Sequence, residues 1–187
     1  MLLSKNKLCM KGPSPIPAVI YTVGHSTRSL DQFVELLRSY GIRRLVDIRT
    51  IPRSRHNPQF NRETLAKFLR SRRINYRHMK ALGGLRHARP DSPNAGWRNA
   101  SFRGFADYMQ TPAFGEALEQ LMDLAAEKPT AIMCAEAVPW RCHRSLIGDA
   151  LTVRGVLVKD IYSPNNVKVH ALSPMAKVRG AAILYPA

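Results

Sequence analysis

The sequence of 187 residues lacks any apolar run that approaches the roughly 20 residues of a membrane-spanning helix, which excludes a membrane protein. It holds only three cysteines, too few for the disulfide framework of a secreted domain. Its first residues lack the apolar stretch and cleavage site of a signal peptide. Internal repeats and low-complexity segments are also missing. We therefore expect a globular protein of a reducing compartment, the cytoplasm, without a membrane partner.

Acidic residues are scarce as well. Only 13 Asp and Glu stand against 29 Lys and Arg, which gives a formal net charge of +16. Such an excess attracts anions, so the composition favours nucleic acid as a partner and a phosphorylated small molecule second. A basic surface that serves only solubility is the alternative. The excess is concentrated in residues 43–90, with fourteen Lys or Arg against two acids, and Tyr76 is available there for base stacking.

Strand-like and helical patterns alternate along the chain. Runs rich in β-branched and apolar residues predict strands at 19–23, 45–48, 74–76, 131–134 and 156–158. Apolar residues at helical spacing lie between these runs, and Ser29 with Gln32 forms a capping-box pattern before the first helix. The alternation predicts an α/β fold: a single domain with a mainly parallel, Rossmann-like sheet of about five strands and helices on both faces.

The same patterns suggest where the domain begins and ends. Residues 1–17, with three lysines and three prolines, are expected to form a flexible basic arm. Residues 18–165 are expected to form the α/β domain. Residues 166–187 are interpreted as a C-terminal tail or an additional edge element, with one more possible strand near 181–184.

Four of the predicted strands are followed by polar or ionisable residues. Parallel α/β sheets bind ligands outside the carboxyl ends of their strands, so these residues are expected to converge at one edge of the sheet. The turn after the first strand is small and hydroxylic, and we expect its backbone N–H groups to hold a phosphate. This turn consists of Gly24, His25, Ser26 and Thr27.

Charged residues after the other strands have expected roles in binding and catalysis. The groups expected to neutralise an anion are Arg49, Arg53, Arg141 and Arg144. The acid–base candidates are Asp47, Glu136 and His143. Tyr76 and His78 follow the third strand and are expected to contact the substrate. A buried ion pair that joins two elements is the alternative interpretation of Asp47 with Arg49.

Two cysteines accompany the fourth predicted strand. Cys142, close to a helix start and beside Arg and His, is a possible nucleophile because such surroundings lower a thiol pKa. Cys134 fits a small buried residue at the strand end. A zinc site is disfavoured, since the spacing is not C-x-x-C and adjacent Cys142 and His143 on a helix would point about 100° apart. No metal and no cofactor are therefore expected.

Six short motifs in this order resemble a known family, the domain of unknown function 488. They are Tyr21–Ser26, Leu45–Arg49, Pro52–Ser54, Tyr76–His78, Leu82–Gly84, and Cys134–Glu136 together with Cys142–Arg144. The resemblance extends over about residues 19–162. It implies a cytoplasmic α/β protein and brings no established reaction.

Three functional hypotheses follow from these observations. The leading one is an enzyme that acts on nucleic acid or on a phosphorylated, nucleotide-like substrate through the cluster at the strand ends. A non-catalytic nucleic-acid-binding module explains the charge equally well, but it leaves Asp47 and Glu136 without a role beyond ion pairing. A thiol- or metal-dependent protein is the third. The sequence does not indicate an oligomeric state.

Overall fold

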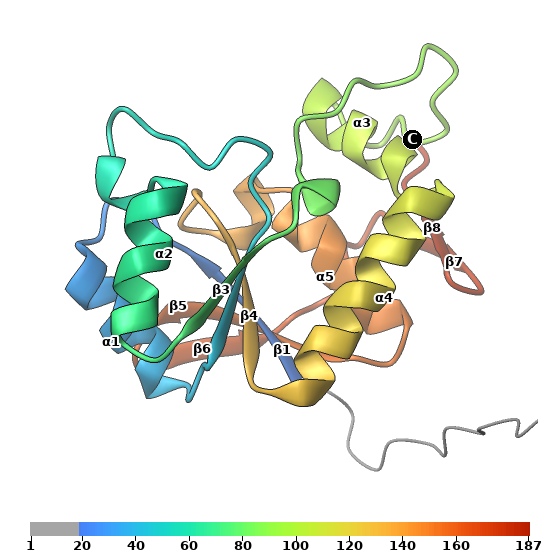
Figure 1. Cartoon of the computed structure of the whole chain (residues 1–187). Coiled ribbons are helices and arrows are strands. Elements are labelled where there is room, and N and C mark those ends of the chain that lie inside the picture. Colours follow the sequence, from blue (N-terminus) through green and yellow to red (C-terminus); the bar gives the residue numbers. More distant parts are fainter. Residues whose placement is uncertain (1–18) are drawn as a thin grey trace, which may run out of the picture.

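The computed structural model describes residues 19–187, and its centre is a six-stranded sheet (Figure 1). The strands are β1 (Val19–Gly24), β2 (Arg44–Asp47), β3 (Asn75–His78), β4 (Thr130–Cys134), β5 (Leu157–Ser163) and β6 (Asn166–Val169). Their spatial order is β3-β2-β4-β1-β5-β6, and all neighbours are parallel except β5 and β6. The predicted α/β domain with a mainly parallel, Rossmann-like sheet is confirmed, with one antiparallel strand beyond the five expected.

Helices cover both faces of this sheet. The longer ones are α1 (Leu30–Ser39), α2 (Arg62–Ser71), α3 (Ala100–Tyr108), α4 (Pro112–Glu127) and α5 (Arg144–Val153). Single 3₁₀ turns lie at η1 (Pro58–Phe60), η2 (Lys80–Leu82) and η3 (Pro139–Arg141). In Figure 1, α1 and α2 lie on one side of the sheet and α4 and α5 on the other. The structure therefore has three layers.

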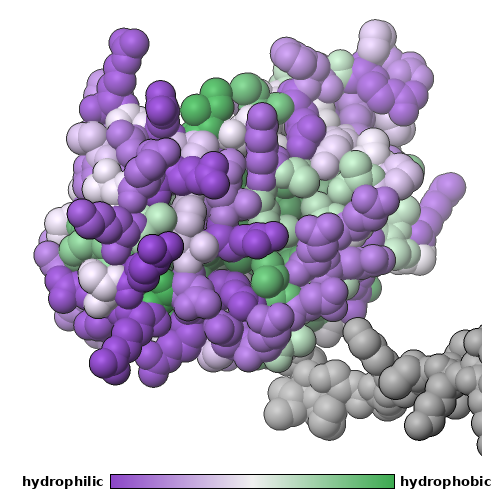
Figure 2. Space-filling model, viewed as in Figure 1, coloured by the Kyte–Doolittle hydropathy of each residue, from purple (hydrophilic) through white to green (hydrophobic). Residues whose placement is uncertain are grey.

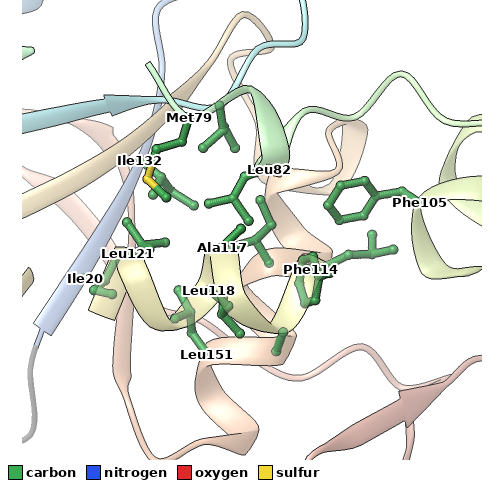
Figure 3. Packing of buried hydrophobic residues seen from close by; sticks show 14 of the residues in the cluster. Ile20, Met79, Leu82, Phe105, Phe114, Ala117, Leu118, Leu121, Ile132 and Leu151 are labelled. Atoms are coloured by element: carbon green, nitrogen blue, oxygen red, sulfur yellow. The ribbon is translucent and has the colours of Figure 1, made fainter. Parts of the chain in front are cut away.

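Each face has its own hydrophobic core. Leu45 of β2 packs with residues of α1 and α2, whereas its neighbour Val46 belongs to the cluster of α3, α4 and α5. This alternation is the period of two that a strand imposes on its side chains. Figure 3 shows the second cluster, in which Leu121 of α4 lies near Ile132 of the sheet and Leu118 lies near Leu151 of α5. The two cores hold the strands, and hence their carboxyl ends, in a fixed register.

The path of the chain makes β4 the strand next to which ligands are expected to bind. The connections after β1 and β2 pass through α1 and α2 on one face. The connection after β4 passes through α5 on the opposite face, and β4 lies between β1 and β2. A crevice opens where neighbouring connections leave a sheet on opposite sides, and parallel α/β proteins bind ligands there. Both edges of β4 meet this condition.

Local sequence signals explain several element boundaries. The capping box of Ser29 and Gln32 is present at α1, and Gly41 follows that helix with φ +66°, a conformation that favours glycine. Asn61 stands at the N-cap of α2, but its side-chain oxygen accepts a hydrogen bond from the Ser54 amide instead of capping the helix. Asn61 thus fixes the loop before α2.

The segment after β5 packs against the rest of the domain. β6 pairs with β5, and β7 (Lys177–Arg179) with β8 (Ala182–Leu184) forms a separate two-stranded sheet. Tyr185 is fully buried, and its hydroxyl donates to Asp149 Oδ2 at 2.8 Å. The flexible arm expected at 1–17 lies outside the described residues. Within 19–187 no helix is long and apolar enough to cross a membrane.

Candidate functional site

The carboxyl ends of β1, β2 and β4 surround a cavity of about 470 Å³. The strand register brings these ends level, because Gly24 pairs with Cys134 and Asp47 with Met133. Six residues expected from the sequence to bind or react line this cavity: His25, Ser26, Thr27, Arg49, Arg53 and Glu136. We refer to this space as the strand-end cavity. Figure 2 shows that hydrophilic side chains dominate the visible surface around α1 and α2, beside it.

The turn after β1 lines the cavity, but the amides of its second and third residues are hydrogen-bonded within the protein. The His25 amide donates to the Cys134 carbonyl at 3.0 Å, and the Ser26 amide to the Ala135 carbonyl at 2.9 Å. The expectation that these amides hold a phosphate is therefore wrong, because they continue the pairing of β1 with the end of β4. The side chains of Ser26 and Thr27 remain at the cavity wall.

Gly24 has a different role from the one expected. A Cβ atom on Gly24 would lie 1.8 Å from the carbonyl oxygen of Glu136. Only glycine therefore lets the loop after β4 cross directly over the end of β1. This close approach forms one wall of the cavity.

His25 is a buried, neutral imidazole. Its Nδ1 lies 2.7 Å from the Ser26 carbonyl oxygen, which only accepts hydrogen bonds, so Nδ1 carries the proton. Its Nε2 lies 3.4 Å from Nη1 of Arg49, and its ring stacks on Phe60 at 4.1 Å. Burial lowers the pKa of His25 below the ordinary histidine value. His25 therefore orients Arg49 and adds no positive charge.

Asp47 and Arg49 form a closed, buried ion pair. Arg49 donates from Nε to Asp47 Oδ1 at 2.9 Å and from Nη2 to Oδ2 at 2.6 Å. The Tyr76 hydroxyl donates to Asp47 Oδ2 at 2.7 Å, and burial together with this carboxylate raises the pKa of Tyr76. Asp47 is fully buried, so this geometry favours a positioning role for its carboxylate. His25, Asp47, Arg49 and Tyr76 are called the arginine network below.

Tyr76 and His78 lie at the outer side of this network. The Tyr76 hydroxyl is occupied by Asp47, and His78 Nε2 lies 2.8 Å from the Arg49 carbonyl oxygen. Neither residue lines the strand-end cavity. An exposed aromatic at this edge is Trp140 in η3. This residue is 61% exposed, and its ring centroid lies 6.1 Å from that of Tyr162. In the sequence, only its position in the loop after the fourth predicted strand could have marked Trp140 as a candidate site residue.

The loop from Ala135 to Val138 is organised by a buried arginine. Arg144 is fully buried and donates to the carbonyls of Glu136 at 2.8 Å and Ala137 at 3.1 Å. These carbonyls are thereby drawn inward. Among residues 19–187, the amides of residues 135–138 have no hydrogen-bond acceptor. Arg144 thus fixes the shape of the loop after β4 from below, whereas Arg141 is exposed and lies outside the cavity.

Cys134, Cys142 and His143 come together on the other face of the same edge. Their donor atoms all lie within 4.8 Å of one another, and Cys142 Sγ lies 3.6 Å from His143 Nδ1. The expectation that Cys142 and His143 diverge on a helix is wrong. Cys142 has extended backbone angles, φ −138° and ψ 142°, and α5 begins only at Arg144. We refer to these three residues as the thiol cluster.

The two thiols have opposite electrostatic surroundings. A hydrogen bond from Cys142, with smaller effects of the neighbouring His143 and Arg144, holds the pKa of Cys134 well below the ordinary thiol value, although burial opposes this. The hydrogen bond that Cys142 donates to Cys134, together with burial, raises the pKa of Cys142. Sequence reasoning favoured Cys142 as the reactive thiol and treated Cys134 as a buried apolar residue. Cys134 ends a predicted strand at the edge where the other candidate residues converge. This position was the sequence signal that Cys134 belongs to the candidate site.

Comparison with known proteins gives one match. A family model described as "Domain of unknown function DUF488" matches residues 29–151. This span includes the loops after β2 and β4 and the whole thiol cluster, but the turn at residues 24–27 precedes it. Neither a curated protein nor a solved structure matches the chain.

Proposed function

The chain belongs to the family of domain of unknown function DUF488, and from its strand-end cavity we propose that it is an enzyme acting on nucleic acid or on another phosphorylated, nucleotide-like substrate. The observation that carries the proposal is the set of anion donors around one cavity. Arg49 and Arg53 line it together with the hydroxyls of Ser26 and Thr27, and the loop after β4 adds amides without protein acceptors. These are the donor types that hold phosphate oxygens.

The charge distribution supports a polymeric or nucleotide substrate. The chain carries a formal net charge of +16, and loop arginines continue outward from the cavity at Arg53 and Arg55. The first residues of the loop after β4 line the cavity, and Trp140 lies farther along the same loop. Its exposed ring is suited to stacking on a base. We expect one nucleotide to place its phosphate in the cavity and its base against Trp140. The thiols suit the reducing cytoplasm expected from the sequence.

Glu136 is the feature that favours an enzyme over a binding module. Its exposed carboxylate lines a cavity otherwise built to attract anions, where a carboxylate weakens binding of a phosphate. A group that costs affinity is explained by proton transfer to or from the substrate during a reaction. Asp47 cannot take this role, because both of its oxygens are hydrogen-bonded within the arginine network.

The first test is fluorescence anisotropy of the full chain with labelled single-stranded DNA, duplex DNA and RNA at low and moderate salt. We expect binding that weakens steeply with salt, since phosphate contacts release counterions. The preferred form then serves as substrate in a turnover assay. Absence of binding to all three at low salt would limit the proposal to small phosphorylated substrates, and a failed nucleotide panel would then overturn it.

Glu136→Gln separates the enzyme from the binding module. The amide keeps the size of the side chain but cannot exchange a proton at neutral pH. We expect turnover to fall by 10²- to 10⁴-fold, a typical range for loss of an acid–base group, while binding stays equal or tightens. Glu119→Gln on the exposed surface of α4 is the matched control. Equal turnover in Glu136→Gln and the control would contradict the enzymatic role of Glu136.

A further inference from the structure

The thiol cluster has the spacing of a metal site. Two donors that bind one Zn²⁺ ion at ordinary bond lengths in a tetrahedron lie roughly 3.6 Å apart for sulfur and nitrogen. Cys142 Sγ and His143 Nδ1 are separated by 3.6 Å, and Cys134 Sγ lies within 4.8 Å of both. The small remaining difference is within the reach of side-chain rotation. Three ligands therefore face one common point.

The imidazole of His143 is held in the tautomer that a metal requires. Its Nε2 lies 3.1 Å from the Leu82 carbonyl oxygen, which can only accept, so Nε2 carries the hydrogen. Nδ1 is then left with its lone pair directed toward Cys142. A hydrogen bond from the second ring nitrogen to a backbone carbonyl is the usual support of a metal-bound histidine.

The surroundings fix the position of this ring. Phe105 packs on His143 with a centroid distance of 4.9 Å. On the other side lies Gly84, where a Cβ atom would be only 2.3 Å from His143 Nδ1. The Arg144 amide donates to Cys142 Sγ at 3.4 Å, which orients the sulfur as well. The cluster is thus preorganised by backbone groups from two separate loops.

We propose that Cys134, Cys142 and His143 bind one Zn²⁺ ion and leave its fourth position open to water or a substrate atom. Two sulfurs and one imidazole nitrogen suit zinc, whereas magnesium and calcium require oxygen ligands. Three protein ligands are the pattern of zinc sites that keep an exchangeable position. A disulfide between Cys134 and Cys142 is the competing use of the sulfurs. The proposal rests on donor geometry and is independent of the proposed function.

Cobalt titration of the full chain tests this directly. Protein purified under reducing, anaerobic conditions and freed of metal with a chelator is titrated with Co²⁺. We expect one equivalent to bind, with thiolate-to-cobalt charge-transfer absorption and the intense visible bands of a tetrahedral ion, and Zn²⁺ to displace it. Cys142→Ser should lose the charge-transfer intensity. Cys9→Ser is the matched control because it removes the third cysteine of the sequence and none of the three proposed ligands, and it should keep the full signal.

A pair of glycine variants tests the geometry without removing a ligand. Gly84→Ala places a methyl group against His143 Nδ1 and should weaken Co²⁺ binding by at least about 10-fold, as loss of a supporting contact does. Gly115→Ala in α4, where a Cβ atom meets nothing within 4 Å, should leave affinity unchanged. If the reduced wild-type protein shows no charge-transfer band when Co²⁺ is added, the proposal is overturned, whatever the variants show. A Cys134–Cys142 disulfide in the anaerobically purified protein also overturns it.

Discussion

The arginine network and the thiol cluster lie at the same edge of the sheet, on opposite faces, and differ in how their polar groups are used. In the arginine network, Asp47 accepts from Arg49 and Tyr76 through both of its oxygens. In the thiol cluster, Nδ1 of His143 and both sulfurs face one another. The first group pairs a carboxylate with the donors of a guanidinium and a phenol, whereas the second brings together three side chains that can each ligate a metal ion.

This difference separates support from ligand binding. A buried charge whose partners are all within the protein fixes the position of a loop, and removing one partner leaves an uncompensated charge. Three metal-ligating side chains that lie within 4.8 Å of one another are the arrangement on which the zinc proposal rests. Of the arginine network, the guanidinium-bearing Arg49 lines the strand-end cavity. The loop after β4 connects that cavity with the thiol cluster.

The largest expected effect comes from breaking the closed network. Asp47→Ala should lower the free energy of unfolding by about 3–5 kcal/mol, because it leaves the buried Arg49 unpaired. Asp31→Ala removes the exposed ion pair with Arg72 and should cost less than about 1 kcal/mol. Urea unfolding of both variants measures the contrast. A loss below 1 kcal/mol for Asp47→Ala would show that the network is not a support.

A second closed network sharpens the comparison through its pH dependence. His170 lies between Asp160 at 2.9 Å and Asp149 at 3.0 Å. Burial opposes its charged form, but hydrogen bonds to the two carboxylates outweigh this and raise its pKa to about 9. A raised folded-state pKa stabilises the fold fully below the unfolded histidine value, near 6.5, and this stability is lost as the pH rises through about 9.

We therefore expect the wild-type protein to lose up to about 3 kcal/mol of stability between these two pH values. His170→Gln should lack this contribution, so the difference in unfolding free energy between the two proteins should shrink as the pH rises. Chemical denaturation at a series of pH values measures the difference and cancels the titration of other groups. A difference that does not change with pH would mean that His170 is neutral in the folded protein.

Much of the fold could be predicted from the sequence, because its signals are local. The capping box at Ser29 and Gln32, the glycine at Gly41 and the alternation of strands with helices all act within a few residues. The convergence of candidate residues at one sheet edge followed from parallel topology. The insertion of β4 between β1 and β2 could not be predicted, since it depends on which faces the distant helices cover.

The roles within the site were harder to predict because they depend on contacts across long sequence distances. Gly24 matters through the Glu136 carbonyl, more than a hundred residues away, and not through its own amide. Arg144 was expected to bind an anion, but it is fully buried and shapes the loop from below. The convergence of Cys142 with His143 required knowing that α5 begins one residue after His143.

The smallest expected effect on stability is the most informative about binding. Arg53 is exposed and lines the strand-end cavity, so Arg53→Ala should change the free energy of unfolding by no more than about 0.5 kcal/mol. Arg179→Ala is the matched control, because this exposed arginine lies on β7, which Figure 1 places away from the strand ends. Both variants remove one positive charge, so net charge alone cannot distinguish them.

The central claim, that the strand-end cavity binds phosphate, is tested most directly by the salt dependence of nucleic-acid affinity in these two variants. The dissociation constant is measured by anisotropy over a range of salt concentrations for the wild type, Arg53→Ala and Arg179→Ala. We predict a steep slope for the wild type and Arg179→Ala, and a slope shallower by about one for Arg53→Ala. Equal slopes for both variants, or no binding by the wild type at low salt, would contradict the nucleic-acid form of this claim.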